Sequence, residues 1–160
     1  MKKITIIRGG CKEPFILENG DKYDSVIIIE DAAGKAIARI PFVNTDFTEK
    51  YKGGILAPGT YRGICARRKS GDKAIWLFRS DRKITAQNQI SAAEYMLPSL
   101  IPNPNHGGKK QMQYILIHRG GLNWDWSHGC VTIIAHYFDR FAKHFEVNEL
   151  CEVELIQAGE

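Results

Sequence analysis

The feature that most constrains the fold of this chain is a succession of short, β-branched apolar segments separated by turn residues. Residues 25–30 read Ser-Val-Ile-Ile-Ile-Glu, and a turn around Gly34 separates them from residues 36–42. β-Branched residues favour strands and glycine favours turns, so we expect these two segments to form a hairpin. Further segments of this kind are 3–8, 60–66, 74–79, 111–118 and 150–156. Short strands at this spacing are typical of a sandwich or a barrel. We expect a mainly β protein with a sandwich-like assembly that occupies residues 1–160 as a single domain.

Two helices complete the expected architecture. Apolar residues recur at i, i+4, i+7 and i+11 near the C-terminus, and this spacing predicts one long amphipathic helix: Ile134, Phe138, Phe141 and Phe145. Residues 91–97 are expected to form a short middle helix that Pro98 stops. Residues 98–108 are rich in Pro, Asn and Gly, which predicts an ordered loop beside a site. His106 within this loop is a candidate substrate contact.

Composition excludes several classes of partner. The net charge of +4 suits an anionic partner such as a cell wall but is too small to indicate nucleic-acid binding. The densest basic cluster, Arg67-Arg68-Lys69, precedes a Ser-Gly-Asp turn and is interpreted as solvated. The apolar run at residues 4–7 ends at Arg8, too early for a signal peptide, and no segment is long enough to insert into a membrane. We therefore expect synthesis in the cytoplasm without a signal peptide, and action on an external substrate only after delivery or release.

The four cysteines show no CxxC pair and no regular spacing, which argues against a disulfide framework. Cys65 and Cys151 lie in apolar, strand-like surroundings, and we expect both to be buried structural thiols. Cys130 differs from them because of its neighbours.

The segment from His118 to Cys130 contains the parts of a cysteine–histidine site. A thiol is a weak nucleophile until an imidazole, a positive charge or a helix N-terminus lowers its pKa from about 8.5. His118 and His128 both lie within twelve positions of Cys130, which we expect to stand directly before the long helix. Gly129 allows a sharp turn that brings backbone amides close to a substrate oxygen. His118, at the end of a strand, is the candidate base.

These residues resemble a known signature. The run Ser127-His128-Gly129-Cys130, after a strand that ends in Ile117-His118, is similar to the motif of the L,D-transpeptidase catalytic domain (YkuD-type) family. The run Leu-Ala-Pro-Gly-Thr-Tyr at residues 56–61 is similar to a turn that leads into a central strand in that family. The likeness covers residues 37–156 and implies an L,D-transpeptidase-like β-sandwich.

The resemblance also implies a role for each residue. Cys130 would attack a peptide carbonyl, and His118 would accept the thiol proton while the main-chain carbonyl of Arg119 holds its tautomer. Amides of Gly129 and Cys130 would form the oxyanion hole, with His128 lining the site. The substrate would be the peptidoglycan stem peptide, and the thioacyl-enzyme would pass its acyl group to an amine or to water without metal or cofactor. By the same resemblance, Ser127 would brace the turn. The candidate substrate contacts are Ser127, Trp126, Trp124, Thr132 and His106, of which Trp124 and Trp126 could stack on sugar rings.

Two departures from the family pattern affect substrate choice. Family members carry an arginine two residues after the cysteine, where this chain has Thr132. Arg119 or Arg67 is a candidate to bind a substrate carboxylate instead. The loop between His118 and Ser127 is also shorter than in the family, which favours water over an acceptor amine. Small phage-encoded proteins share this compact arrangement, which suggests lysis or cell-wall remodelling during phage or effector delivery as the setting.

Two other functional classes fit the same residues. His118, His128 and Cys130 could ligate Zn²⁺ and leave a fourth position for water, as in a zinc hydrolase, although the spacing matches no standard zinc motif. The replacement of arginine by Thr132 is also compatible with a catalytically inert cell-wall-binding module of the same fold.

Overall fold

The computed structural model describes residues 1–43, 55–81, 95–103, 107–120 and 131–158. The strands of the main sheet are β1 (Lys2–Arg8), β4 (Val26–Glu30), β5 (Ala36–Val43), β6 (Gly59–Arg67), β7 (Lys73–Arg79), β10 (Leu116–Arg119), β11 (Val131–Ile133) and β12 (Leu150–Gln157). Two small ribbons pair β2 (Phe15–Ile16) with β3 (Lys22–Tyr23), and β8 (Leu97–Asn103) with β9 (Lys109–Met112). One helix, α1 (Ala135–Ala142), completes the described structure.

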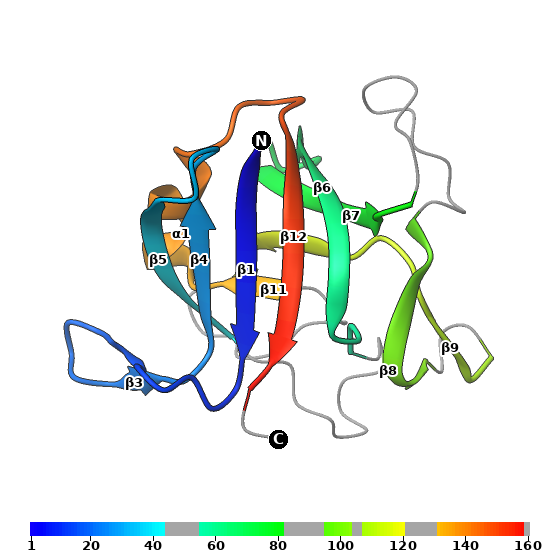
Figure 1. Cartoon of the computed structure of the whole chain (residues 1–160), viewed down its shortest axis with the longest axis horizontal. Helices are drawn as coiled ribbons and strands as arrows, with labels where there is room; N and C mark the ends of the chain where they lie inside the picture. Colours follow the sequence, from blue (N-terminus) through cyan, green and yellow to red (C-terminus); the bar gives the residue numbers. More distant parts are fainter. Residues whose placement is uncertain (44–54, 82–94, 104–106, 121–130, 159–160) are drawn as a thin grey trace.

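The prediction of a mainly β protein is confirmed, but the predicted sandwich is wrong, because the main sheet closes on itself. The strand order is β1-β12-β6-β7-β10-β11-β5-β4, and β4 pairs with β1 to complete a closed barrel of eight strands. Strand β1 lies between β12, which runs parallel to it, and β4, which runs antiparallel (Figure 1). A sandwich leaves edge strands with unpaired backbone groups, whereas closure pairs both edges of each of these eight strands.

The barrel interior is filled by alternate side chains of its strands. In β12 the buried residues are Cys151, Val153 and Leu155, with more exposed residues between them. Cys65 and Cys151 are almost completely buried, as predicted, and both are free thiols. Burial raises the pKa of each, to about 12 for Cys151, so both remain protonated and unreactive at neutral pH.

The predicted long C-terminal helix is also wrong, since α1 has only eight residues. Beyond it, the amides of His144 and Phe145 bond to carbonyls three residues back, so the chain tightens and leaves the helix. The Lys73 ammonium donates to the carbonyl of Ala142 at 2.9 Å and to that of Phe145 at 2.7 Å, which satisfies backbone acceptors that a longer helix would have used. Within the described ranges, no helix is long and apolar enough to cross a membrane.

The apolar period that predicted the long helix still marks buried positions. Phe138, Phe141 and Phe145 are at most 4% exposed, and they line a small internal space with Cys65 and Ile75. Their rings therefore pack against the barrel although only two of them belong to the helix.

Two further expectations are corrected beside the barrel. Residues 111–118 do not form one strand, because the backbone of Tyr114 adopts a φ of 55°, which separates β9 from β10. The predicted loop at residues 98–108 begins with most of β8, whose prolines are tolerated in a two-stranded ribbon. Of the predicted middle helix, residues 91–94 lie outside the described residues, and Leu97 begins β8.

Candidate active site

His118 lies on β10, beside the strand that follows Cys130 in the sequence. Strands β10 and β11 are parallel neighbours, and His118 is paired with Thr132. Ile117, Val131 and Ile133 belong to the buried core, so the alternation of a strand places His118 and Thr132 together on the outer face of the barrel. Both are nevertheless buried, with exposures of 6% and 0%.

The hydrogen bonding of the His118 ring defines its tautomer. Nδ1 lies 2.8 Å from the main-chain oxygen of Arg119, the contact that the family resemblance implies. A carbonyl oxygen only accepts, so Nδ1 carries a proton and donates it to Arg119. The Arg68 guanidinium lies 3.4 Å from the same nitrogen, and since Nδ1 is already protonated this approach is a charge contact. In the neutral ring, Nε2 is left with the lone pair that a general base requires.

The surroundings of His118 favour this neutral form. Burial is the largest influence and lowers the pKa of His118, because it penalises the charged imidazolium. The hydrogen bond to Arg119 acts in the opposite direction, while the Arg68 cation lowers the pKa further. The net pKa lies below the ordinary 6.5, so the ring is a neutral base at physiological pH.

The lowered pKa predicts a pH-dependent loss of stability on the acid side. As the pH falls through 6.5, the unfolded chain protonates His118 before the folded protein does, so the free energy of unfolding decreases until the lower folded pKa is reached. His118→Asn, which keeps a donor toward the Arg119 carbonyl but does not titrate, is expected to show a flatter profile. Urea unfolding between about pH 5 and pH 8 measures this.

His144 requires a control in that experiment, because its pKa is lowered too, by burial and then by Lys143 and Lys2. His144→Asn is expected to remove a separate part of the pH dependence of the free energy of unfolding, and to leave the part that comes from His118. If the free energy of unfolding varies with pH equally in the wild type and in His118→Asn, the description of His118 as a buried neutral ring is contradicted.

Gly120 and Thr132 pack tightly next to His118. The amide of Gly120 donates to the carbonyl of Ile133 at 2.7 Å, which extends the contact of β10 with β11. A Cβ at Gly120 would lie 2.5 Å from the Thr132 methyl carbon, so only glycine allows this approach. The Thr132 hydroxyl is completely buried and has no hydrogen-bond partner among the described residues.

A cleft of about 860 Å³ is lined in part by Arg68, the residue that contacts His118. We call it the aromatic cleft, and it is lined by Arg68, Lys69, Ser70, Trp76, Tyr114 and Leu116. Trp76 and Tyr114 both contact the ring of Tyr95, at centroid distances of 5.8 Å and 5.0 Å. The sequence indicated that Arg68 lies in a solvated turn. The fold instead places it against His118, 50 residues away in the sequence, a contact that no local pattern predicts.

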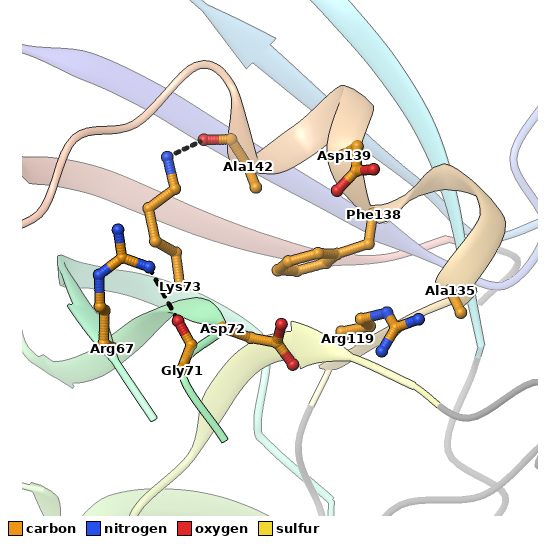
Figure 2. A pocket seen from close by; sticks show the side chains of 9 residues that line it. All are labelled: Arg67, Gly71, Asp72, Lys73, Arg119, Ala135, Phe138, Asp139 and Ala142. Atoms are coloured by element: carbon orange, nitrogen blue, oxygen red, sulfur yellow. Dashed lines mark hydrogen bonds between the residues drawn. The ribbon is translucent and has the colours of Figure 1, made fainter. Parts of the chain in front are cut away.

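Arg67 and Arg119 line a second cleft, of about 440 Å³, beside α1 (Figure 2). Arg67 donates to the carbonyl of Gly71 at 2.8 Å, and Asp72 and Asp139 place negative charge in the same cleft. The two arginines suggested by the sequence as carboxylate ligands thus lie in a cleft of mixed charge, whereas Arg68 is the arginine that contacts His118.

The remaining predicted site residues lie outside the described residues: Cys130, Gly129, His128, Ser127, Trp126, Trp124 and His106. The cysteine–histidine pair and the alternative zinc site therefore stay predictions. In the part of the chain that the structure covers, no three His, Cys, Asp or Glu residues gather to hold a metal ion. One expectation for Cys130 is wrong, since β11 separates it from α1 and the helix does not begin directly after it.

Comparisons of the chain with protein-family models, with curated proteins and with solved structures find no match. The function is therefore inferred from the chemistry of the site.

Proposed function

We propose that this protein is a cysteine acyl-transfer enzyme that acts on peptidoglycan stem peptides through a thioacyl-enzyme, with Cys130 as nucleophile and His118 as base. The proposal keeps the L,D-transpeptidase-like assignment that the motif Ser127-His128-Gly129-Cys130 suggests. It also keeps the proposed setting, in which the protein reaches the cell wall by delivery or release.

The observation that carries the proposal is the hydrogen bond between His118 Nδ1 and the Arg119 carbonyl. This bond fixes the tautomer of the imidazole and leaves the lone pair on Nε2, so the Arg119 carbonyl takes the position that a carboxylate has in a catalytic triad. Strand β11, which begins one residue after Cys130 in the sequence, is the parallel neighbour of the strand that holds His118. The covalent chain thus ties the proposed nucleophile to the strand next to the proposed base.

The chemistry follows from these roles. Nε2 of His118 accepts the proton of the Cys130 thiol as the sulfur bonds to the substrate carbonyl carbon. The carbon–nitrogen bond then breaks, and the imidazolium returns the proton to the departing amine, which leaves a thioester. An acceptor amine or a water molecule, deprotonated by His118, attacks this thioester and releases the thiol. A lowered His118 pKa suits both steps, because the ring must be neutral at the start of each.

A carbapenem labelling experiment tests the nucleophile. Intact-protein mass spectrometry of the wild type is expected to show one added carbapenem, and Cys130→Ala is expected to show none. Cys11→Ala is the matched control, because Cys11 is the partly exposed thiol among the described cysteines and should leave labelling unchanged. Failure of the wild type to react would favour the inert wall-binding module, and stoichiometric zinc in the purified protein would favour the metal site.

Defined muropeptides then identify the reaction. Incubation with tetrapeptide and pentapeptide substrates, followed by mass analysis, distinguishes a cross-linked dimer from a shortened monomer. A dimer identifies a transpeptidase, and a monomer that has lost its terminal residue identifies a carboxypeptidase.

A further inference from the structure

We propose that the aromatic cleft binds the acyl donor by a free carboxylate, and that Arg68 is the residue that selects this carboxylate. The inference rests on the proposed function, since it assigns a substrate group to a cleft beside the proposed base. It concerns a specificity-determining residue on the turn between β6 and β7.

The charge of the cleft indicates an anionic ligand. Among its lining residues Arg68 and Lys69 are cations and none is acidic. Neither cation forms an ion pair with another described residue. The acidic residue of the same turn, Asp72, is 3.3 Å from the Ser70 hydroxyl and lines the other cleft. Two cations in the lining of a cleft, without a counter-ion among the described residues, attract an anion.

The remaining lining residues indicate the kind of group attached to the carboxylate of the ligand. Trp76, Tyr114 and Leu116 give the cleft a mainly apolar and aromatic surface. Such a surface suits a carbon skeleton better than a polyanionic phosphate chain, which would need cations along its whole length. A guanidinium matches a carboxylate with two parallel hydrogen bonds, so Arg68 suits a ligand with one such group on an apolar stem.

The position of Arg68 connects the cleft to the chemistry. Its Nη1 atom lies 3.4 Å from Nδ1 of His118, and Leu116 lies two residues before His118 on the same face of β10. A carboxylate on Arg68 would therefore lie next to the base, with the adjoining part of the donor over Trp76 and Leu116. Arg68 would act on binding and position, and would not touch the reacting atoms.

This placement has a measurable consequence for His118. In the free protein the Arg68 cation helps to lower the pKa of His118. A bound carboxylate offsets that cation, so the pKa of His118 should rise when the donor binds. The acid limb of kcat should then lie at higher pH than the acid limb of kcat/KM, which reports the free protein.

The test uses acyl donors in matched sets. One set compares a tetrapeptide acid with its C-terminal carboxamide, and a second compares donors whose diamino acid side-chain carboxyl is free or amidated. The wild type is expected to prefer the free acid in one set by about tenfold to hundredfold in kcat/KM, the range of a hydrogen bond to a charged group. Arg68→Gln should remove that preference and the separation of the two acid limbs, while Arg68→Lys should restore part of the preference. Arg67→Gln is the control, since Arg67 lines the other cleft and should leave the preference intact.

Two results would overturn the inference. One is equal use of acid and amide donors by the wild type in both sets. The other is an acid preference that Arg68→Gln retains. Carbapenem labelling of Cys130 in the same samples separates these results from a failure of the proposed function, because labelling persists if only the role of Arg68 is wrong.

Discussion

His118→Asn is expected to slow acylation of Cys130 at pH 7 by about 100- to 10,000-fold, the range that general-base catalysis contributes. Asparagine retains a donor for the Arg119 carbonyl and a similar volume, but it has no Nε2 lone pair to accept the thiol proton. The measurement is the rate at which a carbapenem or a tetrapeptide donor adds to the protein, followed by mass. The rate of the variant should recover as the pH approaches the ordinary thiol pKa of about 8.5, because the thiolate then forms without a base.

His144→Asn is the matched control, because it changes another histidine of lowered pKa, in the turn after α1. It should react at the wild-type rate. If His118→Asn also keeps the wild-type rate at pH 7, another group activates the thiol and the assignment of His118 is wrong.

Phe141→Ala is expected to reduce the free energy of unfolding by about 3–5 kcal/mol, the usual effect of removing a buried aromatic ring. The side chain is 1% exposed and lies between the rings of Phe138 and Phe145, at centroid distances of 6.1 Å and 5.4 Å. Its loss leaves a cavity where the helix meets the barrel. Urea unfolding followed by fluorescence measures the change, with the slope of the transition as a check that the unfolded state is unaltered.

Asp139→Ala on the same helix is the control, since Asp139 is exposed and its loss should change stability by less than about 0.5 kcal/mol. A similarly small effect of Phe141→Ala would show that α1 contributes little to the core, contrary to the packing described above.

The strands were largely predictable because period-two alternation is a local property. The hairpin of β4 and β5, and the strands β1, β6, β7 and β12, all occur where β-branched segments predicted them. Alternation identifies which side chains face the core but not which strand lies next to which. It therefore did not distinguish a barrel from a sandwich, and it did not reveal the pairing of β1 with β12. The helix was predicted too long because Phe145 is buried without being helical, and the Lys73 contacts that satisfy the backbone there join residues about 70 positions apart.

The candidate site was predictable only where neighbours in sequence are also neighbours in space. The contact of His118 with the Arg119 carbonyl joins adjacent residues, and the family resemblance implied it. Arg68 and Trp76 come to the site through the pairing of β6, β7 and β10, which no local pattern reveals. The sequence therefore suggested Arg67 and Arg119, which the fold places at the other cleft.

The pairing of β1 with β12 has a consequence for how the protein folds. The two strands are about 149 residues apart along the chain, and until they meet, β1 and β6 each present an open edge to solvent. Bringing such distant segments together is slow, because the loop entropy is lost before the contacts form. We expect refolding to be limited by this last closure, and partly folded molecules to associate through the two open edges until residues 150–157 occupy the gap between them.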